Sequence, residues 1–131
     1  MRILIVEDDF VGRKVMLKML AEYGECDVAV DGREAVRAFD LAWEAGVPYD
    51  VLFLDIMMPN MSGHEALKII RDKERERGVP AAREVKVLMT SALDDVKNVT
   101  QSFFQGGASA YLVKPIERRK IVEELRKLGL I

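Results

Sequence analysis

Short apolar runs alternate with amphipathic stretches along the whole chain, a pattern that is typical of repeated βα units. The first run is continuously apolar, as expected for a parallel strand that is covered on both faces. Five runs predict strands at Arg2–Glu7, Asp27–Val30, Asp50–Leu54, Glu84–Thr90 and Ala110–Val113. The run Asp50–Leu54 is the most apolar, which predicts a central position in the sheet.

The stretches between these runs carry apolar residues at helical spacing. In the first stretch the residues that recur at this spacing are Val11, Val15, Met16, Met19, Leu20 and Tyr23. The predicted helices are Val11–Tyr23, a stretch from the Asp31-Gly32 turn to near Gly46, Glu65–Arg77, Asp94–Gln105 and Glu117–Leu128. The run Lys73–Arg77 alternates in sign, which indicates a solvated helix end. The chain is therefore expected to adopt an α/β fold.

Length and composition narrow the class further. The 131 residues suit a single domain, 1–131, without an attached output domain. A net charge of −2 gives no basic footprint for nucleic acid. Cys26 is the only cysteine, which fits a reducing cytoplasm, and no apolar run is long enough to span a membrane. We expect a cytoplasmic domain that binds neither nucleic acid nor a membrane directly.

Acidic residues follow two of the predicted strands. Glu7, Asp8 and Asp9 come after the first strand, and Asp55 comes after the third. Because the carboxyl ends of parallel strands share one edge of a sheet, Asp8, Asp9 and Asp55 are expected to converge. Two carboxylates about 5 Å apart repel by ~3 kcal/mol at an effective dielectric near 20, which calls for a compensating cation. Oxygen ligands suit Mg²⁺, which also binds phosphate.

The competing interpretation is an acidic helix N-terminus, where carboxylates are favoured by free N–H groups and by the helix dipole. It accounts for one carboxylate, for which Asp9 is the candidate, but not for an acid after a separate strand. The remaining strand ends carry Thr90-Ser91 and Lys114-Pro115. One hydroxyl can cap a helix while the other faces a phosphoryl oxygen. The Lys114 ammonium can neutralise Asp55, although most lysines stay in water.

Four segments carry most of this chemistry: 4–9 (LIVEDD), 52–63 (LFLDIMMPNMSG), 87–92 (VLMTSA) and 107–115 (GASAYLVKP). Together and in this order they resemble the receiver domain of bacterial two-component response regulators, as in stand-alone chemotaxis regulators. The resemblance covers essentially the whole chain. It implies a doubly wound, flavodoxin-like sheet of five parallel strands, in the order 2-1-3-4-5, with five helices on its two faces.

The resemblance also implies roles for individual residues. Asp55 matches the phosphoacceptor, and Lys114 matches the lysine that accompanies it. Direct Mg²⁺ ligands would be Asp9, Asp55 and the backbone carbonyl of Met57, with Asp8 acting largely through water.

The remaining matches concern the response to phosphorylation. Pro115 matches a cis-proline that orients the lysine before it. The switch hydroxyl of the family stands just before an alanine, so Ser91 is the better match and Thr90 the alternative. Tyr111 matches the aromatic residue that turns inward when this hydroxyl moves.

The function implied is acceptance of a phosphoryl group from a histidine kinase or a histidine phosphotransfer protein. The surface formed by the fourth helix, fifth strand and fifth helix would then signal to a downstream effector protein, with phosphorylation-dependent dimerisation as a further expectation. Such a protein is not an enzyme, apart from its own phosphorylation and dephosphorylation. One alternative is a binding module that keeps the fold without phosphorylation. Another is a phosphohydrolase of the haloacid dehalogenase type, which needs an acid where Met57 stands.

Overall fold

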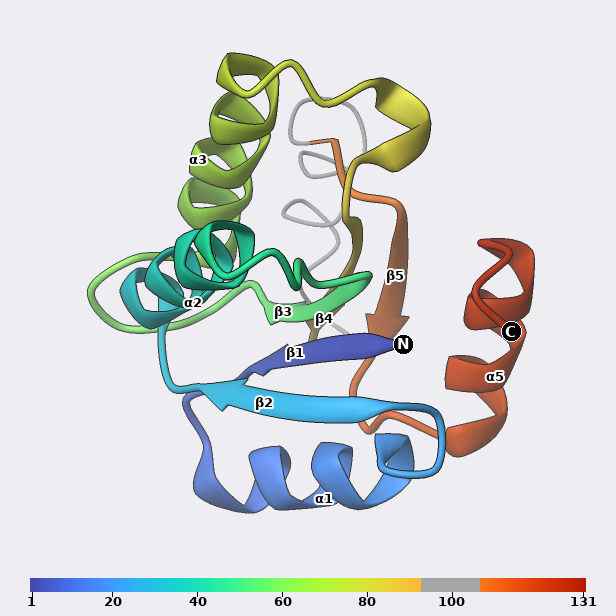
Figure 1. The fold of residues 1–131 in the computed structure, drawn as a ribbon. Coiled ribbons are helices and arrows are strands. Elements are labelled where there is room, and N and C mark those ends of the chain that lie inside the picture. The colour runs from blue at the N-terminus through green and yellow to red at the C-terminus, as the bar shows by residue number, and fades with distance from the viewer. Residues whose placement is uncertain (93–106) are drawn as a thin grey trace.

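Five parallel strands form one sheet in the order β2-β1-β3-β4-β5, as the resemblance implies (Figure 1). The computed structural model describes residues 1–92 and 107–131, so the helix predicted at Asp94–Gln105 lies outside the described residues. The strands are β1 (Arg2–Val6), β2 (Glu25–Ala29), β3 (Val51–Asp55), β4 (Lys86–Ser91) and β5 (Ala110–Val113). Every strand boundary lies within two residues of the predicted one. Every residue of β3 is buried, which fits its central position.

Helices cover both faces of the sheet, which confirms the doubly wound architecture. The helices are α1 (Phe10–Leu20), α2 (Gly32–Glu44), α3 (Gly63–Glu76) and α5 (Arg118–Lys127), with a 3-10 turn, η1 (Ala81–Arg83). In Figure 1, α1 and α5 lie on one side of the sheet, and α2 and α3 lie on the other. This arrangement buries two apolar cores, one on each face.

The apolar stripe predicted for α1 is only partly buried. Met16 and Leu20 belong to the core between α1, α5 and the sheet. Val11 and Val15 are 65% and 45% exposed, so the apolar residues at helical spacing are not all covered by the core. Both valines line an open cavity at the carboxyl edge of the sheet, where α1 begins, and therefore remain accessible to solvent.

The end of α3 carries a buried ion pair. Arg71 and Glu74 are 7% and 1% exposed, so the interpretation of Lys73–Arg77 as a solvated run is wrong for Glu74. Arg71 Nη1 lies 2.6 Å from Glu74 Oε1, and Glu74 Oε2 accepts a hydrogen bond of 2.7 Å from the Val85 N–H. Arg71 also donates to the carbonyls of Val85 and Gly107. Burial of the two charges is tolerated because they face each other and the backbone of neighbouring segments.

Candidate functional site

The candidate site lies at the carboxyl edge of the sheet, where four strands end. Asp55 is the last residue of β3, and Ser91 is the last residue of β4. Lys114 follows β5 directly, and Glu7 follows β1. The parallel arrangement therefore brings together residues that are far apart in the sequence, as the strand-end pattern predicted.

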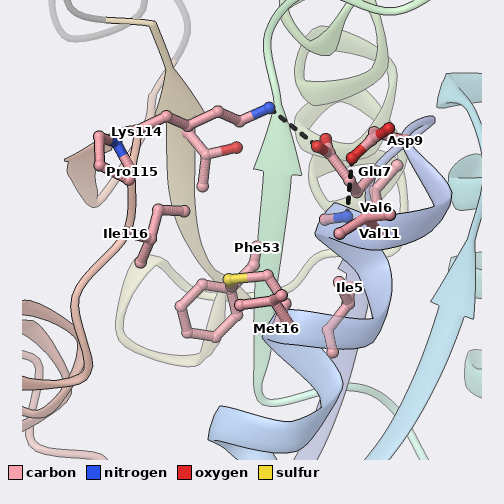
Figure 2. Close-up of a pocket in the computed structure, with 13 residues that line it drawn as sticks. Ile5, Val6, Glu7, Asp9, Val11, Met16, Phe53, Lys114, Pro115 and Ile116 are labelled. Atoms are coloured by element: carbon pink, nitrogen blue, oxygen red, sulfur yellow. Dashed lines mark hydrogen bonds and ion pairs between the residues drawn. The ribbon is translucent and has the colours of Figure 1, made fainter.

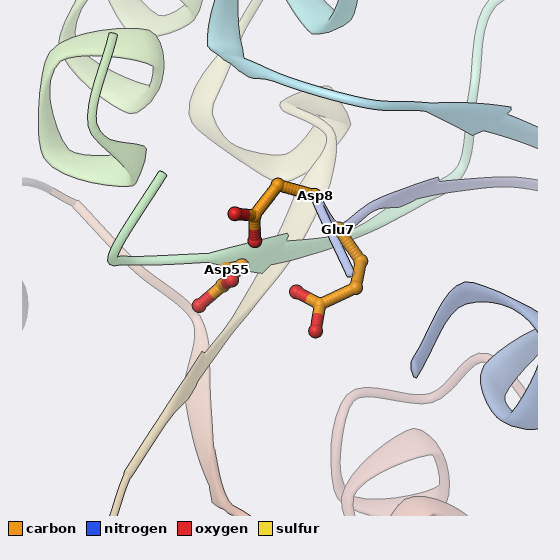
Figure 3. A group of neighbouring side chains, drawn as sticks. All are labelled: Glu7, Asp8 and Asp55. Atoms are coloured by element: carbon orange, nitrogen blue, oxygen red, sulfur yellow. The ribbon is translucent and has the colours of Figure 1, made fainter. Parts of the chain in front are cut away.

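Three acids meet at this edge (Figure 3). Glu7, Asp8 and Asp55 each offer one carboxylate oxygen, and these oxygens lie within 4.8 Å of one another. Glu7 and Asp55 are buried, whereas Asp8 is exposed to solvent. Glu7 is the member that the sequence interpretation left without a role.

Lys114 reaches into this acidic cluster from the other side of the edge. Its Nζ lies 2.8 Å from Glu7 Oε1 (Figure 2). The same Nζ lies 3.4 Å from Asp55 Oδ2. Burial lowers the pKa of Lys114, but the contacts with Glu7 and Asp55 outweigh burial and raise the pKa above its ordinary value. The ammonium therefore stays charged. The peptide bond between Lys114 and Pro115 is cis, as the resemblance implies.

The cluster carries more negative charge than Lys114 balances. Burial raises the pKa of Asp55 to about 8, and the neighbouring Glu7 carboxylate adds to this increase while Lys114 opposes it. Glu7 Oε2 is buried and has no hydrogen-bond partner among the residues that the structure describes. Three carboxylates thus surround one ammonium, and the Glu7 Oε2 oxygen has no partner among the described residues. This set of oxygen ligands fits a hard divalent cation such as Mg²⁺.

Asp9 has a different place in the structure. It is the N-cap of α1, and its Oδ2 accepts a hydrogen bond of 2.7 Å from the Gly12 N–H. The capping interpretation of one carboxylate is thus confirmed for Asp9. Its direct contact with Mg²⁺ stays a prediction. Asp9 is not a member of the acidic group formed within residues 1–92 and 107–131.

The two candidate switch hydroxyls point to opposite faces of the sheet. Thr90 lines the cavity beside α1, together with Phe53 and Met16. Side chains alternate along a strand, so Ser91 faces the other side. Ser91 is opposite Val113 in the register of β4 and β5, and Tyr111 lies two residues earlier on that face. Ser91 and Tyr111 therefore share a face.

Ser91 is also poised to accept a new contact. It is 1% exposed, and its hydroxyl has no hydrogen-bond partner among the described parts of the chain. Tyr111 is partly buried against the core that α2 and α3 form with the sheet. The choice of Ser91 over Thr90 as the switch hydroxyl stays a prediction, and the structure places Ser91 on the same face as Tyr111.

Met57 lies beside the acid that it follows by two positions. Its backbone N–H donates a hydrogen bond of 3.3 Å to Asp55 Oδ1, and its side chain is exposed. The role predicted for its carbonyl as a metal ligand stays a prediction.

An apolar cavity of about 390 Å³ opens beneath the charged groups (Figure 2). Its walls come from α1, β1, β3 and the start of the β5–α5 connection, including Pro115 and Ile116. Glu7 and Lys114 lie at its polar end. The ion pair between them therefore has an apolar surface on one side, which strengthens the electrostatic interaction.

Residues 3–126 match the family model of the response regulator receiver domain. The chain belongs to this family. The receiver domain is 35% identical over 133 residues to probable histidine kinase 2 of Oryza sativa, and the match covers 94% of this chain. It covers 12% of the kinase, so the chain spans about an eighth of that relative.

Two solved structures resemble this receiver domain closely. The receiver domain of the histidine kinase CKI1 from Arabidopsis thaliana, complexed with Mg²⁺ and BeF₃⁻, has a TM-score of 0.83 and 29% identity, covering 98% of this chain and 89% of that one. A chain from the co-crystal of the Saccharomyces cerevisiae phosphotransfer protein Ypd1 and the Ssk1 receiver domain has a TM-score of 0.83 and 25% identity, covering 98% and 88%. These similarities place the receiver domain within two-component phosphorelay signalling.

Within residues 1–92 and 107–131, none of the helices has both the length and the apolar character that a membrane span requires.

Proposed function

We propose that this receiver domain accepts a phosphoryl group on Asp55 from the phosphohistidine of a histidine kinase or a histidine phosphotransfer protein. The observation that carries the proposal is the position of Asp55 at the end of β3, close to the Glu7 and Asp8 carboxylates and 3.4 Å from the Lys114 ammonium. The complex of Ypd1 with the Ssk1 receiver domain, to which this chain is similar, supports the phosphohistidine partner.

The proposed reaction moves one phosphoryl group between two side chains. An Asp55 carboxylate oxygen forms a bond to phosphorus while the bond from phosphorus to the imidazole nitrogen of the partner breaks. Such transfers depend mainly on positioning and on stabilisation of charge. Asp55 must be ionised to react, and Lys114 favours that form because its ammonium lies 3.4 Å from Asp55 Oδ2.

The side chains that would hold Mg²⁺ are Glu7, Asp8 and Asp55, with the Met57 carbonyl as a further ligand. When bound, Mg²⁺ supplies positive charge that offsets the three carboxylates and the incoming phosphoryl oxygens. Asp9 serves the helix as its cap in this proposal. Its Oδ2 accepts a hydrogen bond from the Gly12 N–H at the start of the helix.

The switch that follows is proposed for Ser91 and Tyr111. The Ser91 hydroxyl donates a hydrogen bond to a phosphoryl oxygen, and Tyr111 repacks on the same face of the sheet. This shifts the population of conformations on the surface that includes β5 and α5. A downstream effector protein, or a second copy of the receiver domain, reads that surface.

Mass spectrometry after incubation with acetyl phosphate and Mg²⁺ tests the phosphoacceptor. We expect one added phosphoryl group, absent from Asp55→Asn and from samples treated with a chelator. Asp50→Asn is a matched control, because Asp50 directly precedes β3 at the opposite edge of the sheet and its substitution should leave phosphorylation intact. Absence of an adduct with acetyl phosphate and with phosphorylated histidine donors would instead support the phosphorylation-independent binding module.

A further inference from the structure

Arg13 contacts the backbone of all three consecutive acids that follow β1. Its Nη1 donates to the carbonyl of Glu7 at 2.9 Å and to the carbonyl of Asp8 at 3.0 Å. Its backbone N–H donates to the carbonyl of Asp9 at 2.9 Å. The Arg13 guanidinium thus bridges the carbonyls of Glu7 and Asp8, while its backbone N–H makes a regular helical hydrogen bond to Asp9.

The side chain of Arg13 is itself held in place. Its guanidinium lies 5.7 Å from the centre of the Phe10 ring, and Arg13 is partly buried. A guanidinium is planar and presents its donors in a fixed arrangement, so it can hold two carbonyls in a defined relative orientation. The directions in which the Glu7 and Asp8 side chains leave the backbone depend on that orientation.

Gly12 affects the same segment because the absence of a side chain leaves room for the Glu7 carboxylate. A Cβ at this position would lie 2.7 Å from Glu7 Oε1 and 3.2 Å from Asp9 Oδ2. Glu7 Oε1 is the oxygen that contacts Lys114. Any larger residue at position 12 must displace the Glu7 carboxylate from its ion pair or distort the cap.

We propose that the first turn of α1 positions the metal-binding acids, with Arg13 orienting Glu7 and Asp8 through their carbonyls and Gly12 making room for the Glu7 carboxylate. The inference rests on the proposed metal-dependent function of this site. Arg13 and Gly12 act through Glu7 and Asp8 without touching the reacting atoms, so they are positioning residues.

Because Arg13 is positively charged, the direction in which Mg²⁺ affinity changes on its removal tests the inference. If Arg13 acted only as a nearby positive charge, its removal would strengthen the binding of Mg²⁺, because like charges repel. If Arg13 positions the acids, its removal weakens Mg²⁺ binding. Lys14 is the matched control, because it is an exposed cation on the same turn, 5.0 Å from the Phe10 ring centre.

The first experiment measures Mg²⁺ affinity by isothermal titration calorimetry in the full chain, with urea unfolding as a readout of folding. We expect Arg13→Met to weaken Mg²⁺ binding about tenfold, in the range seen for outer-shell partners of metal ligands. Arg13→Lys keeps the charge but not the guanidinium geometry and should recover only part of the loss. Lys14→Met should leave the affinity unchanged or raise it slightly.

The second experiment tests the match between Gly12 and Glu7. Gly12→Ala should weaken Mg²⁺ binding in the wild-type background. The side chain of Glu7→Asp is one methylene shorter, so Gly12→Ala added to Glu7→Asp should weaken binding much less. A double-mutant cycle on Mg²⁺ affinity measures this coupling, and additive effects would overturn the role of Gly12.

The outcomes separate this inference from the proposed function. Unchanged or tighter Mg²⁺ binding in Arg13→Met, with Asp55 still phosphorylated, would overturn the role of Arg13 alone. A wild-type chain that binds Mg²⁺ in an Arg13-dependent way but accepts no phosphoryl group would overturn the proposed function and leave the positioning role supported. If Arg13→Met does not fold, Arg13→Lys decides the role of Arg13.

Discussion

Charged side chains are buried at both edges of the sheet, but their hydrogen bonds and ion pairs are completed to different extents. At the amino edge, near the starts of β4 and β5, each carboxylate oxygen of Glu74 has a partner, Arg71 Nη1 for one and the Val85 N–H for the other. At the carboxyl edge, Lys114 pairs with Glu7 Oε1, while Glu7 Oε2 is left without a partner among the described residues.

The difference separates a structural from a functional use of buried charge. A buried ion pair with its remaining hydrogen bonds satisfied is tolerated and holds neighbouring segments together. A surplus of like charge destabilises the fold, and its retention indicates a ligand that compensates it. Burial, and after it the neighbouring Glu7 carboxylate, raise the pKa of Asp55 to about 8, so the charged form of this acid is disfavoured in the metal-free site.

The largest expected change in the free energy of unfolding comes from breaking the Arg71–Glu74 ion pair at the amino edge. Glu74→Leu leaves the buried Arg71 guanidinium without its closest acid and should lower the free energy of unfolding by about 3–5 kcal/mol. Urea unfolding measures the loss. Asp72→Ala on the same helix removes an exposed partner of Arg75 and should cost less than about 1 kcal/mol. Equal losses in the two variants would show that the Arg71–Glu74 pair adds nothing beyond a surface pair.

Binding of a cation at the carboxyl edge should instead raise the free energy of unfolding. Mg²⁺ at 100 times its dissociation constant should raise the free energy of unfolding by about 2.7 kcal/mol, because it binds only the folded chain. Urea unfolding in MgCl₂ and in NaCl of equal ionic strength measures the increment. Asp55→Asn should lose most of it, whereas Asp72→Ala should keep it. A full increment in Asp55→Asn would place the ion elsewhere.

Neutralising one acid should stabilise the metal-free chain. The raised pKa means that folded Asp55 keeps its proton between about pH 4 and pH 8, where an unfolded aspartate has lost it. Stability therefore falls as the pH rises through this window, and the full penalty is present above about pH 8. Asp55→Asn should reduce the dependence of stability on pH. At pH 8.5 it should raise the free energy of unfolding by on the order of 2 kcal/mol. Urea unfolding in EDTA across this pH range measures both effects, and a destabilised Asp55→Asn would contradict a crowded acidic site.

The smallest expected effect distinguishes a helix-capping role of Asp9 from a role as a metal ligand. Asp9→Ala should cost about 1 kcal/mol through loss of the α1 cap while leaving Mg²⁺ affinity nearly unchanged. Asp31→Ala is the matched control, since Asp31 caps α2 through the Glu34 N–H. Urea unfolding and calorimetric titration distinguish the two roles. A large loss of Mg²⁺ affinity confined to Asp9→Ala would make Asp9 a ligand, as the family resemblance implies.

The sheet could be predicted from the sequence because parallel strands buried on both faces are short apolar runs. The position of Asp55, Ser91 and Lys114 at one edge followed from the ends of those runs. The family resemblance implies metal contacts for Asp8 and Asp9, whereas the acidic group within the described residues consists of Glu7, Asp8 and Asp55. Because β1 ends at Val6, one residue before the predicted end, Glu7 lies at the strand end close to Asp55. Asp9 directly precedes the helix that it caps, and this placement was the available signal.

The amino-edge pair could not be predicted in the same way. Arg71 and Glu74 are three residues apart on a helix rich in charge, a pattern that usually indicates a solvated face. Their burial depends on Val85 and Gly107, which approach α3 from segments 11 and 36 positions away. Only the assembled structure brings those backbone groups into place.

The contact between Lys114 and Glu7 joins residues 107 positions apart and gives the site an order of assembly. During synthesis from the N-terminus, the three acids leave the ribosome long before β5 exists. The Lys114 ammonium reaches them only when β5 pairs with β4, and such non-local pairings form slowly. The ion pair at the carboxyl edge therefore forms only when the last strand joins the sheet.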